Sequence, residues 1–293
     1  MAIKYESGTV GVSFLHVVPL NFDAFPYYDE VNRVYLACKQ FYEGDTTYLG
    51  DLTKEQEDAI LAEYRKFCEE SVFVDDQYSG DPTFYGDDEG KLKYTAENID
   101  DFVEFKTNQS NRTDFCKYLT MCKYIKDHLF STAPLEHASL TIKVTNVSAG
   151  LCTLWERNRI KISSIKEPVL TSDIINNDIT MILPYKLCDN EKAEEAKKAV
   201  EDYLNQLPGV MEKIIKAGVS LSDAQCILPN ALRTSMVTTL NFREWMNTFK
   251  FFLNHDTSRE MVDVVHMVWS NLNADMPFVW ADCWKREIKK PKY

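Results

Sequence analysis

One short segment decides between an all-helical and a mixed fold. From Ser139 to Val147 apolar and polar residues alternate, whereas the segments around it have helical spacing. Side chains of a strand point alternately to its two faces, so the alternation predicts a strand. The apolar, β-branched run at residues 9–19 predicts a second strand. We therefore expect an α+β fold, with a small antiparallel or mixed sheet and a mostly helical second half.

Most of the remaining chain shows the spacing of amphipathic helices. Thr53 and Gln56 match the reciprocal capping box that opens helices, so a helix of about 18 residues is expected to begin there. Helical segments are also predicted at residues 29–42, 115–130, 148–159, 189–207, 210–218, 232–253 and 256–272.

The overall composition bounds the class of protein. With 293 residues, 45% hydrophobic and 27% charged, the chain is expected to be soluble and globular. We expect no membrane span and no signal peptide, and hence a cytoplasmic protein. The eight cysteines form no CxxC pair or Cys/His cluster, which indicates reduced thiols and no metal site. A net charge of −12 argues against a nucleic-acid partner.

Residues 74–104 differ from the rest of the chain because they are rich in acids and in Gly, Asp and Pro turns. This composition is typical of a solvated loop or of a lobe inserted into a domain. The D-x-D-x-D-G spacing of a calcium loop is absent, so a calcium site is not favoured.

Four basic residues lie close together in this acidic chain: Arg157, Arg159, Lys161 and Lys166. If the backbone is extended there, Arg157 and Arg159 point to the same side. Two planar guanidinium groups on one side suit a phosphate or pyrophosphate, which each can hold through two parallel hydrogen bonds. A solvated face that pairs with the acidic segment would explain the same residues, and both explanations stay open.

A second polar cluster, Asn241, Arg243 and Asn247, lies among Phe, Trp and Met residues. Arg243 and Asn247 are four residues apart, so they share a face of a helix. Polar groups in such surroundings need hydrogen-bond partners if they are buried. The cluster indicates either a ligand site or the polar edge of a helix that packs through its aromatic face.

Both clusters belong to longer segments that resemble one family, the flavin-dependent thymidylate synthases. Residues 136–163, EHASLTIKVTNVSAGLCTLWERNRIKIS, are similar to the family's E-H pair, alternating strand and R-H-R. Ser164 and Glu167 are similar to its S-x-x-E, two residues late. Residues 203–249 resemble its later block of Y-L, G-V, A-R-x-x-L-P and N-x-R-x-x-x-N, and VNRVYLACK at 31–39 is a looser likeness.

The resemblance covers residues 115–272 well and 30–42 loosely, whereas residues 43–112 have no counterpart in the family's common short form. It implies a single domain over residues 1–293 with an acidic insertion at 43–112. It also implies a homotetramer with FAD bound between subunits. The family makes dTMP from dUMP with a methylene group from methylenetetrahydrofolate and a hydride from reduced flavin, and NADPH reduces the flavin.

Carried over by position, the resemblance implies three groups of site residues. The FAD contacts fall on Glu136, His137, Arg157, Asn158, Arg159, Asn241, Arg243 and Asn247. The contacts to the pyrimidine deoxynucleotide monophosphate fall on Arg159, Ser164, Gln225 and Asn254, and Lys161 and Arg233 are expected to join them as replacements for missing arginines. The catalytic contacts fall on Arg157, Glu167 and Asn254. The chemistry needs no cysteine nucleophile and no metal.

Several positions depart from the family's pattern. Asn158 stands in the middle of R-H-R, and Gln225 replaces the arginine before L-P. Residues 169–171 read Val-Leu-Thr in place of the S-G-R phosphate loop. Phe252, or Asn254 if two residues are inserted, stands where an arginine polarises the uracil. Each lost arginine–phosphate bond costs about 1.5–3 kcal/mol, and the available replacements are Lys161, Lys166, Arg233 and Arg259.

Three functions therefore stay open. The first is one-carbon transfer to a pyrimidine nucleotide, with dUMP as the default. Methylation or hydroxymethylation of dCMP is a variant of it, because the amide of Asn254 both donates and accepts hydrogen bonds and could read either base. The second is a flavoprotein with another redox role. The third is a catalytically silent paralogue, such as a structural subunit.

Overall fold

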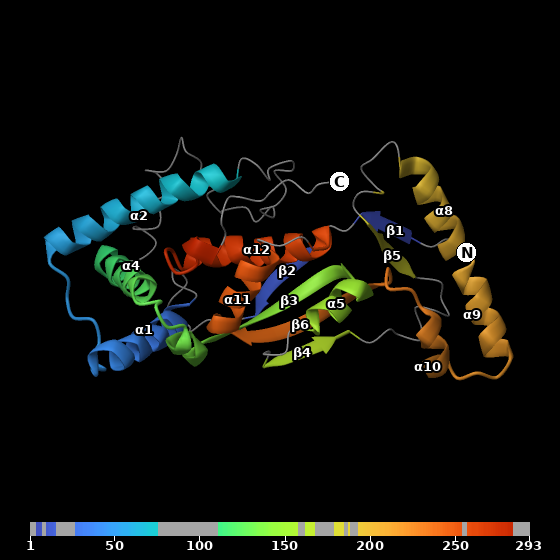
Figure 1. Ribbon diagram of the computed structural model, residues 1–293, viewed down its shortest axis with the longest axis horizontal. Coiled ribbons are helices and arrows are strands. Elements are labelled where there is room, and N and C mark those ends of the chain that lie inside the picture. Colours follow the sequence, from blue (N-terminus) through green and yellow to red (C-terminus); the bar gives the residue numbers. More distant parts are fainter. Residues whose placement is uncertain are drawn as a thin grey trace. The chain divides into compact units, whose positions relative to one another are not determined.

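The computed structural model describes the chain at residues 4–7, 10–15, 27–75, 111–157, 162–167, 179–184, 187, 193–253 and 257–283 (Figure 1). The chain divides into two compact units, which we describe one at a time. The first unit comprises Met1–Leu15, Leu140–Leu240 and His255–Val268. The second unit comprises His16–Ser139, Asn241–Asn254 and Trp269–Tyr293.

A four-stranded sheet organises the first unit, with the strand order β2-β3-β6-β4 (Figure 1). Pairing is antiparallel between β2 and β3, where Gly11 faces Thr145, and between β4 and β6, where Ser163 faces Thr239. The strands are β2 (Gly11–Leu15), β3 (Ser139–Ser148), β4 (Ser163–Lys166) and β6 (Arg233–Asn241). The predicted α+β fold and the predicted strand at 139–147 are confirmed.

The predicted helix at residues 232–253 is wrong over its first part, because residues 233–241 form β6. In β6 buried and partly exposed residues alternate, with Thr234, Met236 and Thr238 on the buried side. Valine and three threonines in this segment favour the extended chain, where branched side chains pack well on a pleated surface. The period-two pattern therefore overrides the helical spacing of the segment that follows.

A smaller parallel sheet joins β1 (Lys4–Ser7) to β5 (Thr180–Leu183) in the same unit. All four residues of β5 are buried, which is typical of parallel strands covered on both faces. Buried residues in and beside β5, together with three from other segments of the unit, form one apolar cluster: Ala149, Ile179, Met181, Leu183, Leu204 and Leu232.

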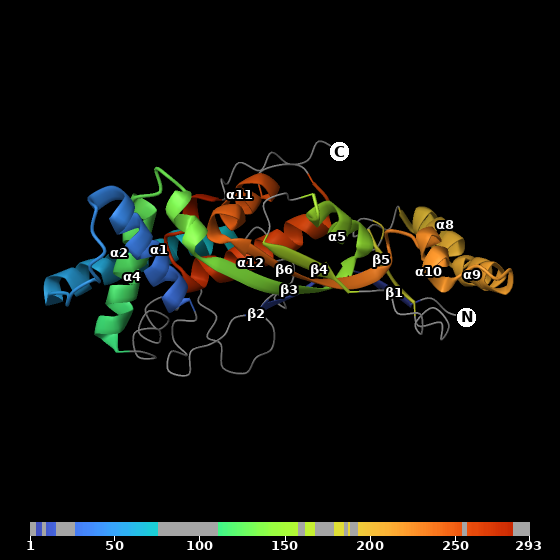
Figure 2. The same cartoon turned by 90° about the horizontal axis from the view of Figure 1, so that it is seen from below.

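Three helices continue this part of the first unit, α8 (Glu194–Leu204), α9 (Leu207–Lys216) and α10 (Leu221–Ala224). They lie together in both views (Figures 1 and 2). Pro208, which separates the predicted helices 189–207 and 210–218, lies at the start of α9. Proline is tolerated there because its missing N–H needs no partner. Gly218 follows α9 with φ of 87°, a left-handed conformation in which glycine carries no steric penalty.

The second unit is built from helices. Its elements are α1 (Tyr28–Glu43), α2 (Lys54–Asp75), α4 (Arg112–Asp127), η2 (Ala133–His137), α11 (Phe242–Phe252), the end of α12 (Arg259–Asp275) and η5 (Ala281–Cys283). The predicted capping box is confirmed, because Thr53 N donates to Gln56 Oε1 at 2.8 Å and Gln56 N donates to Thr53 Oγ1 at 3.3 Å. Helices α1 and α2 both pack against α4.

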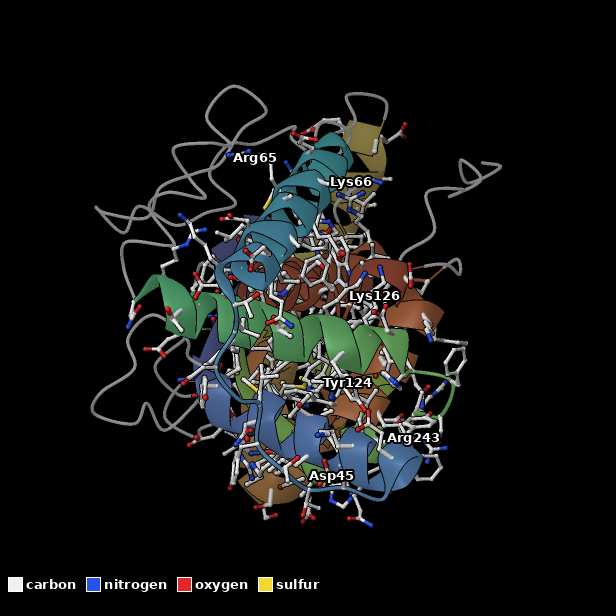
Figure 3. All side chains as sticks on the ribbon, turned by 90° about the vertical axis from the view of Figure 1, so that its left-hand side faces the viewer. Asp45, Arg65, Lys66, Tyr124, Lys126 and Arg243 are labelled. Atoms are coloured by element: carbon white, nitrogen blue, oxygen red, sulfur yellow. The ribbon has the colours of Figure 1, made fainter. Side chains whose placement is uncertain are left out.

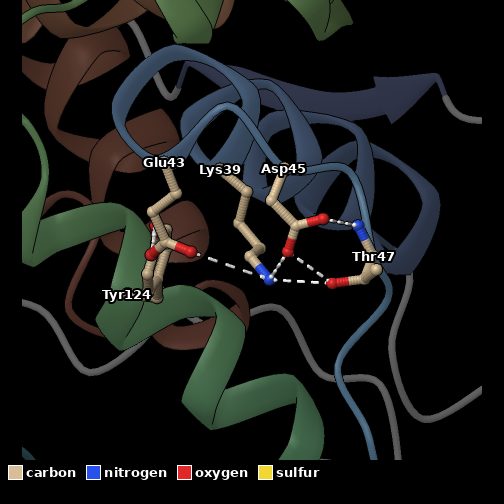
Figure 4. Close-up of polar contacts among 5 residues, drawn as sticks. All are labelled: Lys39, Glu43, Asp45, Thr47 and Tyr124. Atoms are coloured by element: carbon tan, nitrogen blue, oxygen red, sulfur yellow. Dashed lines mark hydrogen bonds and ion pairs between the residues drawn. The ribbon is translucent and has the colours of Figure 1, made fainter.

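A polar network fixes the chain where α1 ends (Figure 4). Lys39 Nζ donates to Asp45 Oδ2 at 2.7 Å and to Thr47 Oγ1 at 3.1 Å, and Thr47 N donates to Asp45 Oδ1 at 2.9 Å. These bonds, the one from Lys39 first, hold the pKa of Asp45 well below its usual range. The Tyr124 hydroxyl donates to Glu43 Oε1 at 2.5 Å, which ties the end of α1 to α4.

Aromatic side chains form the core around α11. Trp280 lies edge-on to Phe242 and Phe249, with ring centroids 5.3 and 5.6 Å apart, and Trp245 stacks with Phe249 at 5.7 Å. All four rings are buried, so α11 presents its opposite face outward. Among the helices that the structure describes, none combines the length and the apolar character that a membrane crossing requires.

Candidate functional site

Helix α11 begins at a residue that the sequence assigns to the flavin site. Asn241 ends β6 and is the N-cap of α11, because its Oδ1 accepts a hydrogen bond from Glu244 N at 2.8 Å. Asparagine is among the preferred N-caps, since its side chain satisfies an N–H that has no partner inside the helix. The Oδ1 of Asn241, a residue predicted to contact FAD, thus caps the helix.

The η2 segment lies directly beside the start of α11. Phe242 N donates to Ala138 O at 2.9 Å, and η2 packs on both α1 and α11. As a result Arg243 Nη1 donates to Glu136 Oε1. The two side chains are 46% and 48% exposed, so the ion pair lies at the surface. Arg243 is seen beside α1 in Figure 3. The structure therefore brings together Glu136 and Arg243, which are 107 residues apart.

Asn247 lies one turn further along the outward face of α11. Its Nδ2 donates to Glu244 Oε2 at 3.2 Å. Only the NH₂ end of an amide can face a carboxylate, so this contact leaves the Oδ1 of Asn247 to accept from elsewhere. His137 is exposed and follows Glu136 directly. Lys250, a further turn along, adds a second exposed cation to this face.

In the first unit, Arg157 lies in the turn that ends α5 (Ala149–Trp155). Trp155 is fully buried, and its Nε1 donates to Thr238 Oγ1 at 3.1 Å, which anchors this turn to β6. The extended backbone considered for the basic cluster therefore does not include Arg157. Three predicted contacts, Asn158, Arg159 and Lys161, lie outside the described residues, as do Asn254 and residues 169–171.

The end of β4 holds Glu167 in a defined place. Glu167 N donates to Ser235 O at 2.9 Å, and the Ser235 hydroxyl donates to Glu167 Oε2 at 2.6 Å. Ser164, on the same strand, faces Thr238 of β6. Sequence reasoning missed Ser235, because it falls in the segment that was predicted to be helical. The alternation of that segment could have identified a strand, but not its pairing with β4.

The remaining predicted contacts of the first unit lie on different elements. Arg233 is exposed at the first position of β6. Gln225 begins η4 (Gln225–Ile227), which follows α10. In the second unit, Phe252 is only 6% exposed at the end of α11. Its ring belongs to the core, so the residue in direct register with the family's arginine offers no polar group.

Of the seven cysteines that the structure describes, six are buried and one, Cys226, is exposed. Cys152 in α5 is 1% exposed, and burial raises the pKa of its thiol to about 11. A thiol with such a pKa stays protonated near neutral pH and is a weak nucleophile.

The donor set of α11 fits an anionic dinucleotide in part. A guanidinium carries five N–H donors, and the contact with Glu136 uses Nη1, so a half-exposed Arg243 retains donors for a phosphate. Asn247 adds an amide to the same face. Glu136 does not fit such a ligand, because its carboxylate pairs with the guanidinium of Arg243 that would bind the phosphate.

Comparison with known proteins bears on both clusters. A sequence profile described as thymidylate synthase complementing protein (Thy1) matches residues 85–278. The flavin-dependent thymidylate synthase of Thermococcus onnurineus (strain NA1) is 34% identical over 113 residues, which are 38% of this chain and 44% of that protein. The enzyme of the same name from Pyrococcus furiosus is 26% identical over 140 residues, 47% of this chain and 54% of that protein.

A third relative, also named flavin-dependent thymidylate synthase, comes from Campylobacter jejuni (strain RM1221) and is 21% identical over 164 residues, 53% of this chain and 75% of that protein. The chain thus spans about half the length of the first two relatives. Because the profile match covers more than half of the chain and includes both polar clusters, the chain belongs to the thymidylate synthase complementing protein family, that of the flavin-dependent thymidylate synthases.

Proposed function

We propose that the chain is an enzyme that transfers a one-carbon unit from methylenetetrahydrofolate to C5 of a pyrimidine deoxynucleotide monophosphate, with dUMP as the default substrate. The observation that carries the proposal is the outward face of α11, where Arg243 and Asn247 present a guanidinium and an amide within the matched segment. When bound, FAD reduced by NADPH would supply the hydride. The matched relatives are named flavin-dependent thymidylate synthases.

The residues of the chain then divide the work by charge. Arg243 would bind the anionic part of FAD, and Asn247 and His137 would orient it by hydrogen bonds. Glu167, whose carboxylate is fixed by Ser235, would orient the nucleotide or hold a proton near it. Arg157, in the turn anchored by Trp155, would add positive charge for a phosphate. Assembly into a homotetramer is part of the proposal, as is a single domain with an acidic insertion at 43–112.

Phe252 favours dCMP as a second candidate substrate. A buried phenyl ring stands where the family places the arginine that polarises uracil. A neutral amide such as that of Asn254 polarises a carbonyl less than a guanidinium does, because hydrogen bonds from charged donors are roughly twice as strong. Cytosine, which presents an amino group, needs a reader that accepts as well as donates.

One experiment separates these functions. The purified protein is supplied with FAD, NADPH and methylenetetrahydrofolate, together with dUMP or with dCMP, and the product is identified by mass. We expect one added methyl group on dUMP, or a methyl or hydroxymethyl group on dCMP. The assay is repeated with Arg243→Ala, which removes the proposed FAD contact. Its matched control is Arg33→Ala, which removes an exposed arginine of α1 in the same unit. Flavin binding without any nucleotide product would contradict the transferase.

A further inference from the structure

The contact between Arg243 and Glu136 places an anion of the chain on the cation that the proposed function assigns to FAD. Glu136 lies on η2 and Arg243 in the first turn of α11, and the hydrogen bond from Phe242 N to Ala138 O at 2.9 Å holds these elements together. The carboxylate is thus held beside the guanidinium by the backbone. It is a built contact between two elements, separated by 107 positions in the chain.

The exposure of the pair decides what it does. Both side chains are about half exposed, at 46% and 48%. An ion pair in contact with water is weak, because solvent screens it and because two long side chains lose freedom to form it. The pyrophosphate of FAD offers the guanidinium two phosphates with one negative charge each, and an oxygen pair that it can hold with bidentate geometry. The pair can therefore open when a phosphate arrives, but the carboxylate must first be displaced or must stay nearby as a like charge.

We propose that Glu136 is an internal competitor for Arg243, which lowers the affinity of the chain for FAD. The proposal rests on the proposed function, in which Arg243 binds the pyrophosphate of FAD. In the structure Glu136 accepts a hydrogen bond from Nη1 of Arg243. When FAD leaves, the carboxylate takes the guanidinium again, so the pair favours release. Glu136 thus sets affinity without supplying any favourable contact to the flavin.

The test is a set of flavin titrations that needs no turnover. Wild type, Glu136→Gln, Arg243→Ala and the double variant are titrated with FAD and with riboflavin, which has the same ring system and no phosphate. Binding is followed by the change in flavin fluorescence. Glu30→Gln is the matched control, because it removes a carboxylate from another exposed pair of the same unit, Arg33–Glu30, at 3.0 Å. Arg243→Gln replaces Arg243→Ala if the alanine variant does not fold.

Glu136→Gln should bind FAD between about two- and fivefold tighter than wild type, the range that corresponds to an exposed ion pair. Its affinity for riboflavin should not change, and Glu30→Gln should match wild type for both ligands. In the Arg243→Ala background, Glu136→Gln should not change the affinity for FAD, because there is no guanidinium left for which Glu136 and FAD compete.

Two outcomes overturn the proposal. If Glu136→Gln binds FAD and riboflavin more weakly, the carboxylate contacts the flavin directly and is no competitor. If the tightening persists without Arg243, it reflects general charge repulsion. A wild-type chain that binds no flavin at all overturns the proposed function as well, so failure of the function and failure of the competition give different results.

Discussion

At the scale of single residues, three carboxylates of the candidate sites accept hydrogen bonds from other side chains of the chain. Glu167 accepts from Ser235, Glu136 from Arg243 and Glu244 from Asn247. A carboxylate held by a charged or hydroxyl donor has a preferred orientation, which a solvated carboxylate lacks. The contact between Ser235 and Glu167 is the one hydroxyl contact among these three, at 2.6 Å, and it connects β6 to the residue that follows β4. We therefore expect Ser235 to position Glu167.

Ser235→Ala tests this positioning. The variant removes the hydroxyl and leaves the backbone hydrogen bond from Glu167 N to Ser235 O in place. One hydrogen bond to a carboxylate in contact with water contributes about 0.5–1.5 kcal/mol, so kcat/KM for the nucleotide should fall roughly two- to tenfold. The free energy of unfolding should fall by no more than about 0.5–1.5 kcal/mol, the contribution of that one bond. Ser163→Ala, which removes an exposed hydroxyl from the neighbouring strand β4, is the control, and an equal loss in both variants would contradict the role of Ser235.

The sequence could predict part of this arrangement. The four-residue spacing of Arg243 and Asn247 was enough to place them on one helix face, because helix geometry is local. The ion pair with Glu136 could not be predicted, because it joins residues 107 positions apart and depends on how η2 docks on α11. The same holds for Ser235 and Glu167, whose contact follows from the pairing of β4 with β6.

At the scale of elements, Asn241 marks the change from strand to helix. The residue has φ of −74° and ψ of 165°, which is extended, and its side chain caps the helix that follows. Sequence analysis merged β6 and α11 into one helix because the helical spacing of the second part was stronger than the alternation of the first. A cap residue between two patterns is the local signal that separates them.

Asn241→Ala should destabilise the protein by about 1 kcal/mol, because Glu244 N loses its partner at the start of α11. Asn241→Ser should retain most of that stability, since serine is also a good N-cap. Urea unfolding measures both variants. Flavin titration of Asn241→Ser then separates the two roles of the residue: weaker FAD binding at unchanged stability indicates that the amide also contacts FAD. Equal stability of Asn241→Ala and wild type would contradict the cap.

At the scale of the whole molecule, two effects of pH on stability oppose each other. The net charge is −12 at pH 7 and the pI is about 5.0, so acidification toward pH 5 reduces the repulsion between like charges in the folded chain. His266 acts in the other direction. It lies in α12 with 7% of its surface exposed, beside the fully buried Val264, Val265 and Val268 of the same helix. Burial, and then the charge of Arg259, lowers its pKa from 6.5 to about 4.

The sign of the His266 effect follows from proton binding. Between pH 6.5 and about 4 the unfolded chain protonates this imidazole and the folded chain does not, so stability falls as the pH falls. The loss amounts to about 3 kcal/mol over that window and then levels off. Asp263 works in the opposite sense, because burial raises the pKa of its carboxyl and the folded state then gains stability as it takes up that proton. The net curve of the wild type therefore mixes several groups.

His266→Gln isolates the histidine, since it keeps a polar side chain of similar size and removes the titration. It leaves the formal charge at pH 7 unchanged, so the repulsion between like charges is the same in both proteins. We expect the free energy of unfolding in urea to fall less steeply in His266→Gln than in wild type from pH 6.5 to 4, with a difference that grows to about 3 kcal/mol. A difference that stays constant across this window would show that His266 takes up its proton equally in the folded and the unfolded chain, which its burial among the valines of α12 argues against.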